Sequence, residues 1–323
     1  MPFNVPISPL QIIAEHPGKE RGITLFIKRD DLLHREICGS KWRKLAAFLP
    51  IVKMAHPSGI VTFGGPFSNH LQAVAAAGRI FGIHTFGIVR GQHADLQNPT
   101  LRAAQADGMM LFPIDKAEYD ACKDRGDELL GRDLPRYYIL PEGGQTPKSV
   151  EACAAIPWEI STQLIQQTPK IGQKPLYLCA PAGTGCTAAG IVAGLVAPNS
   201  RALVFPVSSH DFDKDTLLRM VAKTDLRDAP HWTEMERRLS IVHDYTFGGF
   251  AKLHPPVMDF ARSFFQQTNI LLDPIYTAKM FFGVFDMLAK GDFAPGSTVV
   301  ALHTGGLQGW EGFGLRYGAA GTV

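Results

Sequence analysis

Short apolar runs alternate with helix-like segments along this chain, and that alternation is the main indication of its fold. The runs are short, nearly continuous and bounded by glycine, proline or charged residues, which is typical of strands buried on both faces of a sheet. They occupy residues 23–28, 59–63, 83–89, 109–112, 137–140, 176–179, 202–207, 239–242 and 298–302. The sequence therefore predicts many short, buried strands.

Segments with helical character separate most of these runs. They begin near residue 41 and recur at 71–80, 99–107, 150–167, 188–195, 257–267 and 277–290. Strands that alternate with helices predict parallel sheets and an α/β architecture. The opening residues are rich in proline, so we expect an extended arm with little regular structure there.

Composition narrows the class of protein. A chain of 323 residues can form two domains, or one large domain, around a full hydrophobic core. Its 46% hydrophobic and 19% charged residues are ordinary for a soluble enzyme and exclude a disordered chain. The formal charge is +2, and lysine and arginine are spread along the chain without a basic stripe for nucleic acid. The expected partners are small molecules.

The cysteines and the N-terminus bear on the compartment. No pair of cysteines has Cys-x-x-Cys spacing, which argues against a zinc cluster or a disulfide framework and for a reducing compartment. The N-terminus lacks the basic region and apolar core of a signal peptide, and no apolar run approaches the length of a membrane span. We therefore expect a cytoplasmic protein that binds neither membrane nor nucleic acid.

Lys41 stands behind two small residues, Gly39 and Ser40, at the start of an apolar helical run. The small residues let the backbone pass close to a bound group, and the helix that follows would direct amide donors at an anion. A partly desolvated lysine has a lowered pKa, which Schiff-base chemistry with an aldehyde cofactor requires. Taken alone, the stretch at 38–45 is explained more simply as a solvated basic helix start.

Four clusters of glycine and polar residues follow predicted strands, at 64–70, 142–144, 183–187 and 303–306. In open parallel sheets, ligands bind beyond the carboxyl ends of the strands. One glycine-rich turn is usually only a turn, but four at one edge predict a shared cleft.

The loop at 183–187 is the best candidate for an anion site, because its backbone amides and two threonine hydroxyls can surround a phosphate. It lacks the Gly-Lys-Ser/Thr ending of a nucleoside-triphosphate loop. It also departs from the dinucleotide pattern Gly-x-Gly-x-x-Gly, because the third glycine is Gly190. A nucleotide-binding α/β protein built on this loop stays an alternative.

Other polar residues have a structural and a functional interpretation. Ser68 and Asn69 are usual helix-capping residues, so residues 68–70 could be an N-cap followed by a surface histidine. Tyr276 could be a packing residue at a helix start, and His303 is more simply a satisfied core histidine. No histidines have the spacing of a metal site.

Taken together in order, seven segments resemble the D-cysteine desulfhydrase and 1-aminocyclopropane-1-carboxylate deaminase family. They are residues 28–32, 39–45, 63–70, 141–144, 183–185, 273–277 and 303–306. The members of this family are pyridoxal-phosphate enzymes. The resemblance implies the tryptophan synthase β-like fold (fold type II), with two open, twisted, mostly parallel sheets flanked by helices. It covers the chain from about residue 10 to 310.

The resemblance also implies roles for individual residues. Lys41 would form the Schiff base and take the α-proton of the substrate, and Ser68 would assist that proton relay. Tyr276 would lie over the reacting carbon. The implied cofactor-binding residues are Lys41, Lys44, Asn69, Gly183, Thr184, Gly185, Cys186, Thr187, Thr277 and Thr304. The implied substrate-binding residues are Ser68, Asn69, His70, Phe250 and Tyr276, with His70 beside the substrate carboxylate.

Two positions help to choose between the activities of the family. The deaminases resemble one another in a glutamate that faces the pyridine nitrogen, where this chain has Thr277, and in a leucine where it has Thr304. A carboxylate keeps that nitrogen protonated and deepens the electron sink that opens a cyclopropane ring. A neutral hydroxyl gives a milder sink, which suffices when thiolate leaves the β-carbon. The two threonines favour desulfhydrase-type β-elimination.

Three residues depart from the family pattern. Ser40 stands where asparagine is usual, Cys186 replaces a glycine of the phosphate loop, and Phe250 stands where a tyrosine hydroxyl would touch the substrate. Loss of that hydroxyl could change substrate choice or abolish the activity. A protein that binds the cofactor with little turnover is therefore a further alternative.

The sequence thus predicts an enzyme with pyridoxal 5'-phosphate in a cleft between two domains. The larger domain comprises residues 1–47 and 159–323, and a smaller α/β domain at 48–158 is inserted into it. The expected activity is that of a carbon–sulfur lyase acting on a small amino acid, with 1-aminocyclopropane-1-carboxylate deaminase as the alternative. The resemblance further implies a homodimer.

Overall fold

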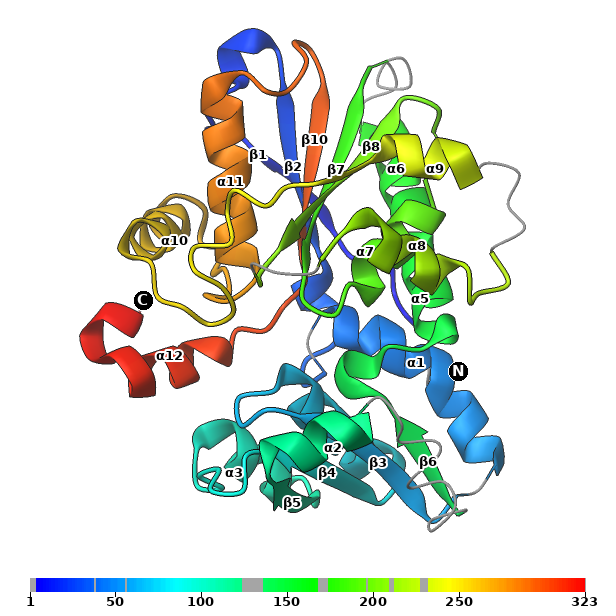
Figure 1. The fold of residues 1–323 in the computed structure, drawn as a ribbon. Helices are drawn as coiled ribbons and strands as arrows, with labels where there is room; N and C mark the ends of the chain where they lie inside the picture. Colours follow the sequence, from blue (N-terminus) through cyan, green and yellow to red (C-terminus); the bar gives the residue numbers. More distant parts are fainter. Residues whose placement is uncertain are drawn as a thin grey trace.

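The computed structural model describes residues 4–37, 39–55, 57–123, 136–167, 174–195, 197–208, 212–226 and 232–322. Cys38, at the start of the lysine stretch, and the first residues of the predicted arm lie outside the described residues. Figure 1 shows two lobes, each built on its own sheet. Mostly parallel sheets flanked by helices confirm the predicted α/β fold class.

The large lobe is built on a six-stranded sheet, with the strand order β1-β2-β10-β7-β8-β9. Its strands are β1 (Leu10–Ile13), β2 (Thr24–Arg29), β7 (Leu176–Ala182), β8 (Ser200–Pro206), β9 (Leu239–Ile241) and β10 (Thr298–His303). The arm prediction is wrong at β1, which pairs antiparallel with residues 25–28 of β2. An edge strand needs only one neighbour, and β2 offers it an open row of backbone donors and acceptors.

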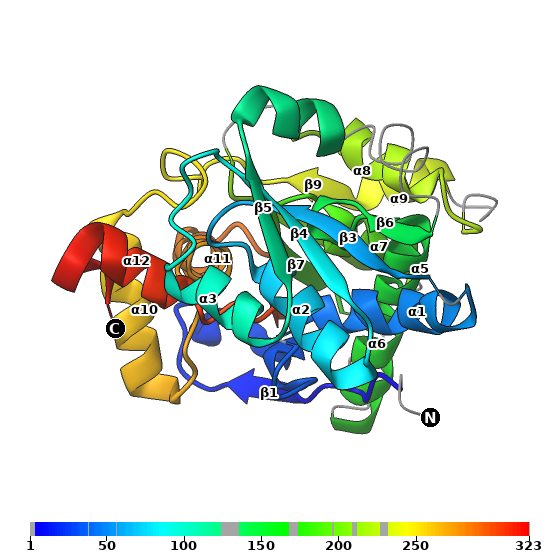
Figure 2. The same ribbon diagram turned by 90° about the horizontal axis from the view of Figure 1, so that it is seen from below.

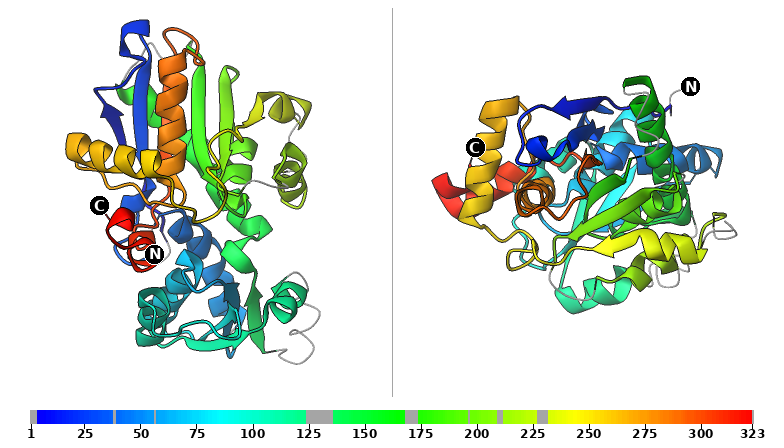
Figure 3. Two further views of the ribbon diagram at one scale, coloured as in Figure 1. Left: turned by 60° about the vertical axis from the view of Figure 1, so that its left-hand side comes forward. Right: turned by 90° about the horizontal axis from the view of Figure 1, so that it is seen from above.

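Helices cover both faces of this sheet, and the strands alternate between two cores accordingly. In β2, Leu25 and Ile27 pack with α10 (Pro255–Thr268) and α11 (Thr277–Lys290) on one face. Phe26 points to the opposite face, towards α5 (Pro147–Cys153), α6 (Ala155–Gln167) and α7 (Cys186–Ala193). Figure 3 shows these helices from two further sides. Burial on both faces explains why the strands are read as continuous apolar runs.

The small lobe has a four-stranded parallel sheet, with the order β5-β4-β3-β6. Its strands are β3 (Gly59–Gly64), β4 (Thr85–Arg90), β5 (Met110–Ile114) and β6 (Tyr137–Leu140). Figure 2 shows α2 (Asn69–Phe81) and α3 (Pro99–Ala106) on one side of these strands.

The proposed domain boundaries both fall inside helices. The helix α1 (Ser40–Ala55) crosses the first boundary, and its Trp42, Leu45 and Phe48 belong to the core of the small lobe. The helix α6 crosses the second boundary, and Ile160 belongs to a core of the large lobe. The inserted domain stays a prediction, and these helices identify the segments that join the lobes.

A buried ionic network ties α1 to the large lobe. The Arg43 guanidinium donates to both carboxylate oxygens of Asp30, at 2.7 Å each, and to those of Glu159 at 2.6 and 2.9 Å. Lys28 lies 2.8 Å from Glu159, and its side chain is fully buried. Burial disfavours a charged guanidinium, but the two carboxylates outweigh that cost and raise the pKa of Arg43. Because Arg43 follows Lys41 by two residues, the network also fixes the start of α1.

Among the helices whose bounds lie within the described residues, α8 (Lys214–Val221), α9 (Trp232–Arg238) and α12 (Gly309–Tyr317) were not predicted. The last of these reaches across to the small lobe, where a Cβ at Gly312 would lie 2.8 Å from the Phe67 ring. Within the described ranges, no helix combines the length and the apolar character needed to cross a membrane.

Candidate active site

A cavity of about 760 Å³ lies at the carboxyl ends of strands from both sheets. As predicted, residues of all four glycine clusters line it, including Ser68, Gly143, Thr184 and Thr304. These residues follow β3, β6, β7 and β10, so loops from both sheets enclose one space. This is where open parallel sheets place their ligands.

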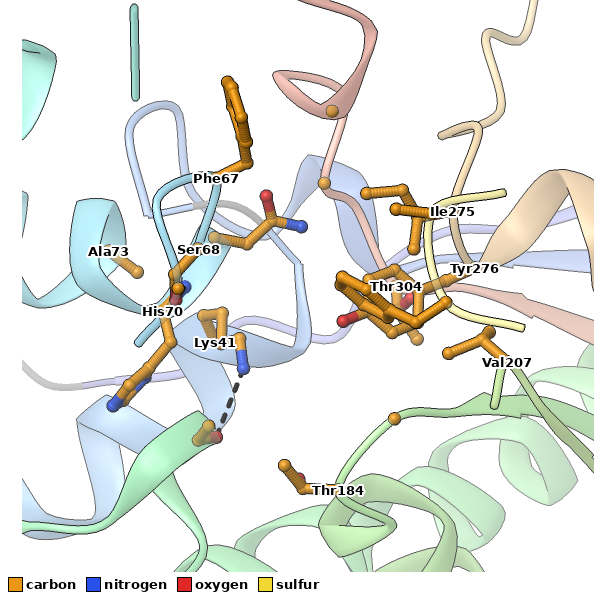
Figure 4. A pocket seen from close by; sticks show the side chains of 18 of the residues that line it. Lys41, Phe67, Ser68, His70, Ala73, Thr184, Val207, Ile275, Tyr276 and Thr304 are labelled. Carbon is orange, nitrogen blue, oxygen red and sulfur yellow. Dashed lines mark hydrogen bonds between the residues drawn. The ribbon is translucent and has the colours of Figure 1, made fainter. Parts of the chain in front are cut away.

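Lys41 lies on the cavity wall, and its amine donates to the carbonyl oxygen of Gly143 at 3.2 Å (Figure 4). Lys44, one helical turn later, points to the same oxygen at 3.4 Å. Burial lowers the pKa of Lys41 from 10.5 to about 7, and the neighbouring charge of Lys44 adds to this effect. The structure thus places a largely neutral amine beside a cation above about pH 7.

The backbone around Lys41 is held against the end of β10. The amide of Ser40 donates to the Thr304 carbonyl oxygen at 3.2 Å. Gly39 adopts φ +64°, and a Cβ there would lie 1.8 Å from the same oxygen. Only glycine permits both the left-handed conformation and this approach.

The loop at 183–187 faces Lys41 across the cavity. A Cβ at Gly143 would lie 2.8 Å from Cγ2 of Thr184, so this loop touches the residue whose carbonyl holds both lysines. Gly185 has φ +88° and caps α7, whose first amides open towards the cavity. Cys186 and Thr187 form the first turn of that helix and also line the cavity. The lysine and the predicted anion loop are therefore brought together.

Ser68 is the N-cap of α2, because its hydroxyl oxygen accepts from the amides of His70 and Leu71 at 3.2 and 3.3 Å. Its hydroxyl hydrogen is still available to the cavity. Asn69 reaches the turn after β10, where a Cβ at Gly306 would lie 2.6 Å from its Nδ2. Asn69 Oδ1 is buried without a partner among the described residues, which leaves it for a ligand.

His70 lines the cavity, and its contact with a substrate carboxylate stays a prediction. Burial and the charges of Lys41 and Lys44 hold the pKa of His70 well below 6.5, so the imidazole is neutral. Nε2 of His70 lies 2.8 Å from Thr62 Oγ1, which also lies 2.8 Å from the Leu140 carbonyl oxygen. Nδ1 has no hydrogen-bond partner among the described residues, and Figure 4 shows the ring directed away from Tyr276.

Tyr276 and Phe250 form the wall opposite α2. Their rings meet edge to face with centroids 5.9 Å apart, and a Cβ at Gly183 would lie 2.9 Å from the Tyr276 ring. Burial raises the pKa of the Tyr276 phenol above its ordinary value, so its hydroxyl keeps its proton. The Phe250 loop is held by Lys279, whose ammonium donates to the carbonyls of Thr246 and Gly249 at 2.8 and 2.7 Å.

Of the two threonines that were predicted to favour β-elimination, Thr277 and Thr304, only Thr304 lines the cavity. Thr277 is fully buried, and its hydroxyl donates to Asp273 Oδ2 at 2.7 Å. That carboxylate also accepts the amides of Ile275, Tyr276 and Thr277 and so caps α11. His303 is satisfied in the core, where Nε2 lies 2.7 Å from the Leu271 carbonyl oxygen and Nδ1 accepts from Gly305.

Sequence reasoning missed several residues of the cavity wall. Arg90 ends β4, and Gln308, Phe313 and Arg316 belong to the segment around α12. None of them lies in a glycine cluster, and α12 itself was not predicted. Only the packing of the two lobes brings them to the cavity.

The residues present fit pyridoxal phosphate. Two adjacent lysines share one carbonyl oxygen, and they face an amide-rich helix start that suits a phosphate. The family described as "Pyridoxal-phosphate dependent enzyme" matches residues 3–305. The chain belongs to this family, and its cofactor is pyridoxal phosphate.

Three individual relatives show which activities are named among similar proteins. A Pyrococcus abyssi protein whose name proposes 1-aminocyclopropane-1-carboxylate deaminase activity is 29% identical over 314 residues, which are 96% of this chain and 91% of the relative. The bifunctional D-cysteine desulfhydrase/1-aminocyclopropane-1-carboxylate deaminase of Arabidopsis thaliana is 28% identical, covering 91% and 75%. The D-cysteine desulfhydrase of Klebsiella pneumoniae subsp. pneumoniae is 26% identical, covering 93% and 91%.

A solved structure supports the fold. The crystal structure of an ACC deaminase homologue superposes with a TM-score of 0.75 at 23% identity, covering 97% of this chain and 93% of the other. The resemblance to the D-cysteine desulfhydrase and 1-aminocyclopropane-1-carboxylate deaminase family is confirmed by these comparisons.

The lowered pKa of Lys41 predicts an unusual pH dependence for its reactivity in the cofactor-free protein. Because only the neutral amine is nucleophilic, acetylation of Lys41 should be about tenfold slower at pH 6 than at its plateau, which it reaches near pH 8. A lysine in an unstructured peptide should keep gaining rate up to about pH 10. Competitive acetylation followed by peptide mass spectrometry measures both rates. A Lys41 rate that rises in parallel with the peptide standard contradicts the placement of this amine.

Proposed function

We propose that the protein catalyses desulfhydrase-type β-elimination on a small amino acid, D-cysteine being the reference substrate. Water and D-cysteine would give pyruvate, ammonia and hydrogen sulfide. The observation that carries this proposal is the neutral Lys41 amine, which faces the phosphate loop within the same cavity as Ser68 and Thr304. The bound cofactor would supply the electron sink for loss of the α-proton.

The residues of the chain then have distinct tasks. Lys44 and the loop at 183–187 would hold the phosphate. Asn69 would form a hydrogen bond with the phenolic oxygen of the cofactor. The Lys41 amine would take the α-proton, with the Ser68 hydroxyl as a relay. The aromatic rings of Tyr276 and Phe250 would border the reacting carbon on one side.

The choice of β-elimination rests on the partner of the pyridine nitrogen. Thr304 offers a neutral hydroxyl at the cavity wall. Asp273, a buried carboxylate beside Gly306 of the cavity wall, already accepts four hydrogen bonds, from the amides of residues 275–277 and from the Thr277 hydroxyl. A neutral partner of the pyridine nitrogen makes the cofactor a weaker electron sink. A weaker sink suffices when a good leaving group such as thiolate departs.

Parallel assays of two substrates test this choice. With protein loaded with pyridoxal phosphate, we expect sulfide release from D-cysteine to exceed 2-oxobutanoate formation from 1-aminocyclopropane-1-carboxylate. The absorbance spectrum before and after D-cysteine addition shows whether the substrate reaches the cofactor. Faster 2-oxobutanoate formation would reverse the assignment.

Ring-opening deamination of 1-aminocyclopropane-1-carboxylate is the second candidate. It is favoured by Tyr276, whose protonated hydroxyl lies in the cavity beside the phosphate loop. A third outcome, suggested by Ser40 and Phe250, is a protein that binds the cofactor with little turnover. Bound cofactor without product from a panel of D- and L-amino acids would support it.

The homodimer stays a proposal from the family resemblance, and the cytoplasmic location stays a prediction. Light scattering on the purified protein measures the first, and a mass of about one chain contradicts it.

A further inference from the structure

Arg90 is a cation on the cavity wall for which the proposed reaction has no use. It is the last residue of β4 and lines the cavity. Gly64 of β3 pairs with Val89 of β4, so Arg90 follows beside Gly65. A Cβ at Gly65 would lie 3.3 Å from Nη2 of Arg90. The guanidinium therefore lies against the loop that leads directly to Ser68.

An aromatic ring holds the guanidinium from a second direction. Its central carbon lies 5.8 Å from the centroid of the Tyr119 ring, and Tyr119 itself is fully buried. None of the ion pairs found in the described part of the chain includes Arg90. A half-buried guanidinium that is stacked on an aromatic ring and has no carboxylate partner is well placed to bind an anion.

The charges of the cavity wall also favour the binding of an anion. Its lining includes the basic residues Lys41, Lys44, Arg90, Lys123 and Arg316 against the carboxylates Glu36 and Glu142. Two of the basic residues, Lys41 and Lys44, are proposed to serve the cofactor. Lys123 pairs with Asp120, and Glu36 pairs with Arg79 outside the cavity. Of the remaining groups, the two arginines Arg90 and Arg316 outnumber the one carboxylate, Glu142. The wall therefore carries a net positive charge in addition to the residues proposed to hold the cofactor.

We propose that Arg90 forms a subsite for a second acidic group, so that the preferred substrate is an amino acid with a carboxylate beyond its β-substituent. This inference rests on the β-elimination proposed above and names its substrate class. Neither cysteine nor 1-aminocyclopropane-1-carboxylate has a group that could occupy this subsite. The planar guanidinium matches a carboxylate with two parallel hydrogen bonds, and Arg316 at the rim attracts the same charge.

Two thioethers of nearly equal size test the subsite: S-carboxymethylcysteine and S-carbamoylmethylcysteine, each as the D and the L form. Elimination breaks the Cβ–S bond, and the sulfur leaves with the electron pair. With one water, the first compound gives pyruvate, ammonia and thioglycolate, and the second gives thioglycolamide instead of thioglycolate. We expect kcat/KM to favour the carboxymethyl compound by about tenfold to a hundredfold.

Two variants assign the preference to Arg90. Arg90→Gln should reduce the ratio between the two compounds to about one, because the charged hydrogen bonds are lost. The matched control is Arg102→Gln, which removes the same charge from the exposed surface of α3 outside the cavity lining and should retain the ratio. Equal kcat/KM values in the unmodified protein, or a preference that survives Arg90→Gln, overturn the subsite.

Calorimetry separates this inference from the proposed reaction. Dissociation constants of both compounds are measured on Lys41→Ala protein supplied with pyridoxal phosphate, where turnover does not interfere. A ratio near one overturns the subsite, whatever the turnover assays give. If the ratio is large but D-cysteine and both thioethers give no product with the unmodified protein, the subsite stands and the proposed β-elimination fails.

Discussion

Replacing Lys41 by alanine is expected to abolish covalent attachment of the cofactor and to lower kcat/KM for D-cysteine by about 10³-fold or more. Among the described lysines that line the cavity, Lys41 alone has its pKa lowered to about 7, so its amine is suited to act both as nucleophile and as base. The measurements are the visible absorbance of the purified variant and its rate of sulfide release.

A second lysine of the same helix provides the control. Lys53→Ala removes an exposed side chain in the last turn of α1, where the ammonium lies 5.6 Å from the Phe81 ring centroid and outside the cavity lining. This variant should retain both the absorbance and the turnover. A Lys41→Ala protein that keeps both properties shows that the role assigned to Lys41 is wrong.

Replacing Arg43 by methionine is expected to lower the free energy of unfolding by about 3–5 kcal/mol. The side chain is buried and makes hydrogen bonds to two buried carboxylates, Asp30 and Glu159. Methionine keeps much of the aliphatic volume but leaves both carboxylates without their main partner. Lys28 still compensates Glu159, so Asp30 bears most of the penalty. Urea unfolding of the cofactor-free protein measures the change.

Two further variants test whether the loss of stability depends on burial and on the geometry of the guanidinium. Arg43→Lys keeps the charge but cannot reproduce the fork, so its loss should be intermediate. Arg237→Met breaks the exposed pair with Glu234 on α9 and should hardly change the unfolding midpoint. If Arg43→Met unfolds at the same urea concentration as the original protein, the network does not join α1 to the large lobe in the way described.

Much of the fold could be predicted because the central strands, such as β3 and β10, are buried on both faces. A continuous apolar run such as residues 298–302 predicts a buried strand. In the structure, this run forms β10, which pairs in parallel with β2 and β7. The edge strand β1 escaped prediction, because half of its side chains are exposed and its structure depends on pairing with β2. The helix α12 begins without a side-chain cap, so its start carries no local signal.

The sequence by itself determined the α/β class, the glycine clusters at the strand ends and the lysine behind Gly39, because each depends on local backbone geometry or on a residue type. Only the tertiary structure decided which side chains meet. It brought Thr304 to the cavity and turned Thr277 towards Asp273, it placed His70 beside Thr62, and it set Arg90 beside Gly65. These outcomes depend on how the two lobes pack against each other. No pattern along one segment of the chain specifies which residues of the two lobes meet.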